Sequence, residues 1–178
     1  MSGLLFMVSL TSCKDEKAQV LYSIICTEDV LDHVTPTVTY TDAKGNERII
    51  ELTKNDFQKA TITDAKTRVS YSLPQYKIVV DYDSFGQEGE CKVKFTRVKT
   101  EPEDKSLYQY YAQLYGSVLV IENKGGSTEV TGNVSMTIDE AQILMSKSRF
   151  DDAIESLTSD ELRLTFSIDK KGKVTFSK

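Results

Sequence analysis

Residue types on which many enzymes depend are scarce in this chain of 178 residues, which holds one histidine and no tryptophan. Catalysis by a Ser-His pair needs a histidine within hydrogen-bond reach of an activated hydroxyl, and the sole histidine is His33. It lies in residues 29–36, which we expect to be a loop before a strand, and a partly exposed structural role fits it better than catalysis. No G-x-S-x-G elbow and no Gly-rich phosphate loop occurs, which excludes esterase chemistry and nucleotide binding by those routes.

Histidine and cysteine, the usual zinc ligands, are few, and negative charges outnumber positive ones. One histidine and two well-separated cysteines, Cys26 and Cys91, cannot form a tetrahedral zinc site without carboxylates of unknown position, and the third cysteine, Cys13, is assigned another role below. We therefore expect no metal and no cofactor. The 22 Lys and Arg residues are outnumbered by 27 Asp and Glu residues, which gives a formal net charge of −5 and argues against a nucleic-acid partner.

Acidic pairs at strand spacing are the remaining route to catalysis. Glu88 and Glu90 stand two residues apart, as do Asp81 and Asp83. Glycoside hydrolysis requires two carboxyl groups that face each other across a cleft, and neighbours on one strand satisfy this only in part. A solvated strand face is therefore favoured for these residues, and a carboxylate-dependent glycan hydrolase is the weaker alternative.

The chain has no hydrophobic run long enough to span a bilayer, but it begins with a short one. Residues 4–10 are apolar apart from one serine, and the polar residues 14–17 follow Thr11-Ser12-Cys13. A short apolar run followed by small residues is typical of a secretion signal. Signal peptides usually open with Lys or Arg, which residues 1–3 lack, so an upstream start and a chance apolar start on a cytoplasmic protein are the alternatives.

The four residues Leu10-Thr11-Ser12-Cys13 resemble a bacterial lipobox. The resemblance implies that a signal peptidase cuts before Cys13, that this cysteine carries a diacylglyceryl thioether, and that its new amino group is acylated again. Each buried methylene contributes about 0.8 kcal/mol, so several acyl chains would tether the protein firmly to a membrane. We therefore expect a signal peptide over residues 1–12 and a lipid anchor on Cys13.

The residues after this cysteine predict the destination. Lys14-Asp15-Glu16 resembles the export signal of Bacteroidetes surface lipoproteins, in which a lysine precedes two acidic residues. The resemblance implies an outer-membrane lipoprotein displayed on the cell surface, and the periplasmic face is the alternative. Residues 13–17 would form a tether, and residues 18–178 are long enough for one domain but not comfortably for two. The composition, with 39% apolar and 28% charged residues, is ordinary for a globular protein.

Short runs of alternating apolar residues, separated by turn residues, fill this domain. Residues 19–26, 76–82 and 91–95 alternate in this way, which is typical of antiparallel sheet. Three further pairs of runs flank glycine-containing turns and therefore predict hairpins. These hairpins pair residues 37–40 with 48–52, residues 118–122 with 128–134, and residues 162–168 with 174–176.

Two stretches favour helix instead. Apolar residues recur with helical spacing over residues 149–157, which predicts an amphipathic helix capped by Ser148. Residues 139–145 could add another turn or two of helix. Residues 107–116 fit both the helical and the strand pattern, and we favour strand because tyrosine suits a half-buried pleated surface.

Together these patterns predict a mainly β domain, an antiparallel β-sandwich with one or two short helices near residues 139–157. Residues 34–45 and 51–57 also resemble segments of uncharacterised Bacteroidetes lipoproteins with immunoglobulin-like sandwiches. The resemblance implies an immunoglobulin-like topology and carries no activity, since one fold hosts many functions.

Cysteines and tyrosines supply the other candidate sites. Once Cys13 is lipidated, Cys26 and Cys91 remain, and export reaches a compartment where disulfides persist. A bridge would close a loop of about 65 residues and stabilise by about 4 kcal/mol in the chain-entropy model, and two buried free thiols are the alternative. Clustered tyrosines could form an exposed ligand platform, although strand cross-pairs are their commoner use. They are Tyr108, Tyr110, Tyr111 and Tyr115.

The expected anchor, the sandwich pattern and the missing catalytic sets favour a non-enzymatic binding or accessory module. Its partners would be the membrane that holds the anchor and an unknown protein or glycan. The first alternative is a fimbria-like or envelope assembly component that donates an edge strand. The glycan hydrolase is the second alternative.

Overall fold

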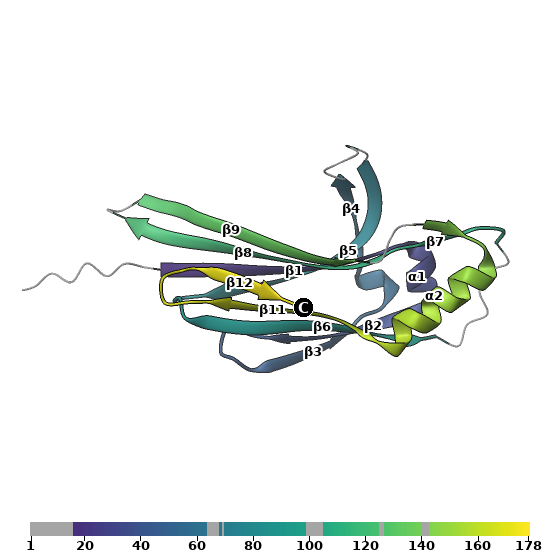
Figure 1. The fold of residues 1–178 in the computed structure, drawn as a ribbon, viewed down its shortest axis with the longest axis horizontal. Coiled ribbons are helices and arrows are strands. Elements are labelled where there is room, and N and C mark those ends of the chain that lie inside the picture. Colours follow the sequence, from purple (N-terminus) through teal and green to yellow (C-terminus); the bar gives the residue numbers. More distant parts are fainter. Residues whose placement is uncertain (1–15, 64–67, 69, 99–104, 125–126, 140–142) are drawn as a thin grey trace, which may run out of the picture.

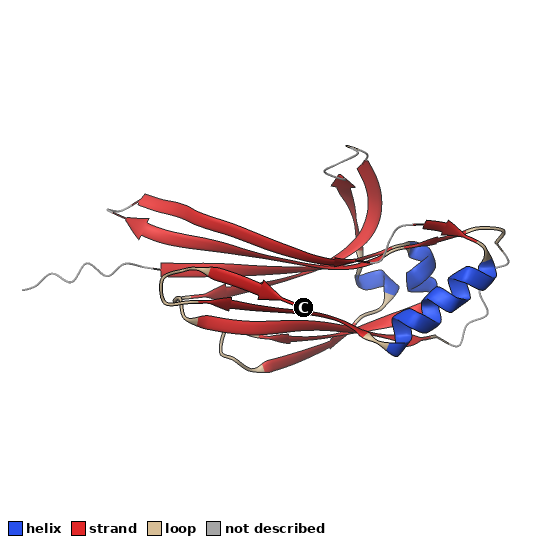
Figure 2. Ribbon diagram, in the orientation of Figure 1, coloured by secondary structure: helices blue, strands red, loops and turns tan. Residues whose placement is uncertain are grey.

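A computed structural model of the chain describes residues 16–63, 68, 70–98, 105–124, 127–139 and 143–178. Most of it is antiparallel strand, arranged in two five-stranded sheets and a short two-stranded ribbon (Figures 1 and 2). The helices gather at one end of the molecule, and the described chain begins at the other end (Figure 1).

We name the two large sheets A and B. Sheet A has the order β4 (Gln58–Thr63), β5 (Ser70–Tyr82), β1 (Glu16–Cys26), β8 (Ala112–Lys124) and β9 (Ser127–Asp139). Sheet B has the order β12 (Val174–Ser177), β11 (Glu161–Ile168), β6 (Gln87–Arg97), β2 (Val34–Thr41) and β3 (Glu47–Glu51). The ribbon pairs β7 (Tyr108–Tyr110) with β10 (Ile143–Met145). The helical elements are α1 (Glu28–His33), the 3-10 turn η1 (Lys54–Asp56) and α2 (Lys147–Ser159).

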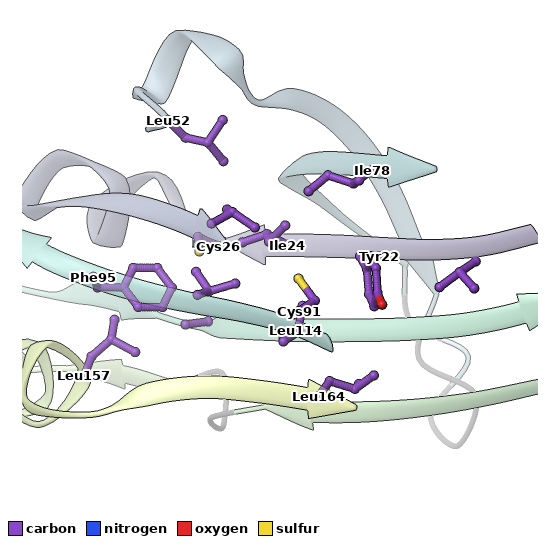
Figure 3. Close-up of a cluster of buried hydrophobic side chains, with 14 of the residues drawn as sticks. Tyr22, Ile24, Cys26, Leu52, Ile78, Cys91, Phe95, Leu114, Leu157 and Leu164 are labelled. Carbon is purple, nitrogen blue, oxygen red and sulfur yellow. The ribbon is translucent and has the colours of Figure 1, made fainter. Parts of the chain in front are cut away.

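A single hydrophobic core lies between the two sheets. On β1 every second side chain from Val20 to Cys26 has no exposed surface, as the alternating sequence predicts. The ring of Tyr22 in sheet A lies 6.4 Å from that of Phe166 in sheet B, and Figure 3 shows side chains from both layers in the same cluster. The predicted mainly β sandwich is therefore confirmed, while the immunoglobulin-like topology stays a prediction.

All three predicted hairpins are present, as β2–β3, β8–β9 and β11–β12. Two of their turns have the same construction. In each, an aspartate, Asp42 or Asp169, accepts hydrogen bonds of 2.7–3.0 Å at Oδ1 from the backbone N–H groups two and four residues later. A glycine, Gly45 or Gly172, then takes a positive φ of 78° or 77°, which a side chain would disfavour.

The predicted helix over residues 149–157 is confirmed as α2, and it buries Phe150, Ile154 and Leu157. Its N-cap residue is Ser146, and not Ser148 as the sequence pattern indicated. The strand prediction for residues 107–116 is also confirmed, since β7 and the start of β8 occupy it.

Three expectations about local structure were wrong. Residues 29–36 are not a loop, because α1 ends at His33 and β2 begins at Val34. The helix expected over residues 139–145 is absent from its described part, where strand β10 pairs with β7, because tertiary pairing outweighs local propensity. Glu16 and Lys17 belong to strand β1 and are not part of a tether, since they pair with β8. Within the described residues, none of the helices has the length and apolar character needed to cross a membrane.

Candidate functional site

His33 lies in the aromatic cluster at the helical end of the core. Its side chain is 6% exposed, so the expectation of a partly exposed histidine was wrong. The ring contacts Phe150 edge-on at 4.9 Å, and Nδ1 lies 2.6 Å from the carbonyl oxygen of Asp29. These contacts give His33 a structural role, since α1 places it against α2 and away from solvent.

The Asp29 carboxylate joins α1 to the ribbon. Its Oδ2 accepts a hydrogen bond of 2.7 Å from the Gln109 backbone N–H, and its Oδ1 lies 2.8 Å from Lys105 Nζ. Partial burial opposes ionisation, but the Gln109 N–H and the Lys105 ammonium outweigh it, and the pKa of Asp29 is lowered. This carboxylate is therefore a structural clamp.

The four clustered tyrosines do not form an exposed platform. Tyr108 and Tyr110 point inward from β7 and are 1% and 2% exposed. The Tyr108 ring stacks on Phe150 at 4.7 Å, so α2 covers the surface that a ligand would need. Tyr111 and Tyr115 are half-buried. The prediction of a ligand platform at these residues was wrong, because the ribbon turns two of its aromatic side chains into the core.

The disulfide that the sequence left open is not formed. Cys26 on β1 of sheet A and Cys91 on β6 of sheet B are both buried free thiols (Figure 3). Burial raises the pKa of Cys26 to about 12, and burial together with the neighbouring Glu90 raises the pKa of Cys91 to about 12. Both cysteines therefore act as small apolar core residues.

The residues predicted for lipidation and export, Cys13, Lys14 and Asp15, lie outside the described residues. Glu16 is the first described residue, and it pairs with Glu122 at the start of the β1–β8 ladder.

The outer face of sheet B carries an open groove of about 510 Å³ at the end of the sandwich where the hairpins turn. Its walls come from four neighbouring strands and one turn. The lining residues are Thr41, Gly45, Glu88, Gly89, Glu90, Thr165, Phe166, Ser167, Thr175 and Ser177. A second open groove of about 560 Å³ continues it toward the turns, and the two share Gly45, Glu88 and Ser167.

Strand register sets the order of side chains in this groove. One row across β6, β11 and β12 consists of Glu88, Ser167 and Thr175, which are paired in register and all exposed. Adjacent strands lie about 4.8 Å apart, so the row presents one carboxylate and two hydroxyls at regular spacing. A ligand along this row would meet a hydrogen-bond acceptor on β6 and hydroxyl groups that both donate and accept on β11 and β12.

The neighbouring row is tied together by interactions within the sheet. The Glu90 carboxylate lies 2.7 Å from Lys92 Nζ and 2.9 Å from Arg163 Nε. The Glu90 backbone N–H donates to the Thr41 hydroxyl at 3.2 Å, and the hydroxyl groups of Thr165 and Ser177 are hydrogen-bonded to each other. This row therefore forms a pre-organised polar wall beside the exposed one.

The groove was missed as a site by the sequence analysis, which assigned Glu88 and Glu90 to a solvated strand face. A signal was present, because serine and threonine alternate with apolar residues on β11 and β12, at Thr165 and Ser167 and again at Thr175 and Ser177. Only the pairing of β6 with β11 shows that these residues adjoin the two glutamates.

Comparison of the chain with protein-family models, with curated proteins and with solved structures finds no match. No group of three or more His, Cys, Asp or Glu side chains placed to hold a metal ion occurs in the described part of the chain.

Proposed function

We propose that the protein is a lipid-anchored, surface-exposed binding or accessory module without enzymatic activity, and that it holds a hydroxyl-rich ligand such as a glycan chain. The observation that supports it best is the groove on sheet B, where Glu88, Ser167 and Thr175 are exposed in one row. A carboxylate accepts hydrogen bonds from sugar hydroxyls, and a side-chain hydroxyl can both donate and accept. The resemblance of residues 10–13 to a lipobox supports the anchor.

The contacts of the two glutamates favour binding over hydrolysis. Both residues lie on β6, and Glu90 is already engaged by Lys92 and Arg163. A glycosidase needs two carboxyl groups on opposite sides of the scissile bond. Among the described residues that line the groove, Glu88 and Glu90 supply the carboxylates from one strand, so this arrangement serves to hold a ligand.

The anchor is tested by proteinase K digestion of intact and lysed cells that express the natural gene or its Cys13→Ala variant. We expect digestion in intact cells, and we expect the variant to lose both membrane attachment and surface exposure. Protection of the natural protein until lysis would instead place the domain inside the envelope. Incorporation of a labelled fatty acid into the natural protein, but not into the variant, is the matched chemical readout.

The groove is tested by affinity electrophoresis of the full chain in gels that contain dextran or xylan. We expect a retarded band, and we expect Glu88→Ala and Ser167→Ala to weaken the retardation several-fold because each removes one hydrogen-bonding group of the exposed row. Glu51→Ala on edge strand β3 is the matched control, since this exposed carboxylate lies outside the groove. Equal mobility of all variants in both gels would contradict the glycan assignment and leave the anchor experiment unaffected.

A further inference from the structure

One edge of the sandwich differs from the other three. The edge strands β3, β4 and β12 have 5, 6 and 4 residues, whereas β9 has 13. Within the described residues, β8 is the sole hydrogen-bonded neighbour of β9, so the far edge of β9 presents unpaired backbone N–H and C=O groups. Such an edge is a template for another strand.

Natural edge strands are usually protected by shortness, charge, proline or bulges. The short strand β3 carries charged residues at Glu47, Arg48 and Glu51, and β4 carries Lys59. These edges therefore resist pairing with another chain, both by length and by charge.

The edge of β9 has one protective feature, and it covers only part of the strand. The register shifts where Val120 pairs with Gly132 and Ile121 pairs with Val130, which leaves Thr131 as the extra residue of a bulge. Beyond it, residues 132–139 pair with β8 without interruption. Residues 132–138 contain no charged residue and no proline. Among the described edge strands, this segment is the long one that lacks charge, proline and bulges.

We propose that this edge is occupied by a second copy of the chain, with residues 132–138 of the two copies paired antiparallel about a two-fold axis near Ser135. Sheet A would then continue from one copy into the other. The pairing brings Asn133 opposite Thr137 and Gly132 opposite Ile138, so no like charges meet across the new ladder.

The contrast between β9 and the other edges also determines the kind of assembly. Head-to-tail growth into a fibre needs two complementary competent edges on each chain, and among the described edge strands only β9 has a long segment without charge, residues 132–138. Pairing of β9 with β9 uses the same surface on both copies and closes the assembly at two. The two-fold axis points the Glu16 ends in opposite directions, so a doubly anchored dimer would lie with its strands along the membrane.

This inference is tested on the full chain with Cys13→Ala, purified in mild detergent, by sedimentation from micromolar to near-millimolar concentration. We expect a concentration-dependent dimer. The double variant Ser135→Lys/Thr137→Lys adds two lysines to this edge. It should raise the dissociation constant of the dimer by at least about tenfold, because the new ammonium groups repel each other across the axis. Ser167→Lys on β11 of sheet B is the matched control and should leave the constant unchanged.

A cysteine placed at the axis supplies a direct readout of the pairing. Cα atoms opposite each other in an antiparallel pair are about 4.5–5.5 Å apart, which a disulfide can bridge. We expect Ser135→Cys to form a covalent dimer under mild oxidation and Ser167→Cys to stay monomeric. A monomer at every concentration would overturn the proposal. So would a dimer that neither the paired lysines nor the cysteine at position 135 affects, since it would use another surface.

Discussion

Gly89 on β6 lies directly opposite Phe166 on β11, and the phenyl ring covers the place where a side chain on residue 89 would be. A Cβ at that position would lie 2.6 Å from Phe166 Cε1 and 3.0 Å from its Cζ. The ring has little room to retreat, because it also packs against Tyr22 and Tyr82, at centroid distances of 6.4 Å and 5.9 Å. The absence of a side chain at residue 89 therefore lets this aromatic cluster connect the two sheets.

Gly89→Ala should lower the free energy of unfolding by about 1–3 kcal/mol, because the added methyl group overpacks the core. Denaturant titration of the variant and the parent measures the difference. Phe166→Leu in the Gly89→Ala background should recover part of the loss, although Phe166→Leu alone is destabilising. Identical midpoints for Gly89→Ala and the parent would show that the ring moves without cost.

Tyr22 places a hydroxyl in the core without a hydrogen-bond partner among the described residues. Removing it in Tyr22→Phe should leave the free energy of unfolding unchanged or raise it by up to about 1 kcal/mol, since a buried polar group without a partner is costly. Tyr22→Ala should lower it by about 3–5 kcal/mol through the lost contacts and the cavity. Thermal and chemical denaturation of the two variants separate these effects, and a large loss in Tyr22→Phe would show that the hydroxyl is satisfied.

Asp42 should make the protein sensitive to acid. The backbone N–H of Asn46, with further hydrogen bonds from Lys44 and Arg48, lowers the pKa of its carboxyl from 3.8 to about 2. A carboxyl with a lowered pKa stabilises the fold fully above its ordinary value, and this stabilisation is lost as the pH falls through the folded-state pKa. Asp42→Asn should therefore melt at a lower temperature at neutral pH, and the difference from the parent should vanish near pH 2.

Melting curves between neutral pH and pH 2 check this expectation. Asp152→Asn is the matched control, because Asp152 is exposed on α2 and the same change of charge there should shift melting little. A difference between Asp42→Asn and the parent that persists unchanged to pH 2 would contradict the assignment of the effect to the ionised carboxyl.

The two core cysteines should not react with thiol reagents in the native protein. The thiolate is the reactive form, and a pKa of about 12 for Cys26 and for Cys91 leaves almost none of it near pH 8. In the Cys13→Ala background we expect no labelling by a maleimide until guanidinium unfolds the chain, and then labelling of both thiols. Ser167→Cys on an exposed strand position is the positive control. Rapid labelling of native protein without that substitution would show that the core opens readily.

Alternation in the sequence predicted the strands well, because burial of one sheet face requires a period of two. On β1 the four residues Val20, Tyr22, Ile24 and Cys26 fall on one side in the sequence and all lie in the core. The β11–β12 hairpin was equally predictable, since Asp169 and Gly172 are the residues that its turn requires. These features are set by residues that lie close together in the sequence.

The candidate site and several details depended on distant residues and were not predictable in the same way. Strand β10 forms because β7 offers it a partner, and Tyr108 is buried because α2 brings Phe150 onto its ring. The groove exists because β11 lies beside β6, which brings Ser167 next to Glu88 from far along the chain. No local pattern encodes which strand becomes the neighbour of another.

The sequence by itself determined the mainly β sandwich, the three hairpins and the amphipathic helix α2, because short-range periodicity and turn chemistry set these directly. The tertiary structure decided the order of strands in each sheet, the burial of His33 and of the tyrosines of β7, the free state of Cys26 and Cys91, and the place of β9 at the edge of sheet A. Each of these follows from which apolar faces pack together, and that choice is made by the whole core at once.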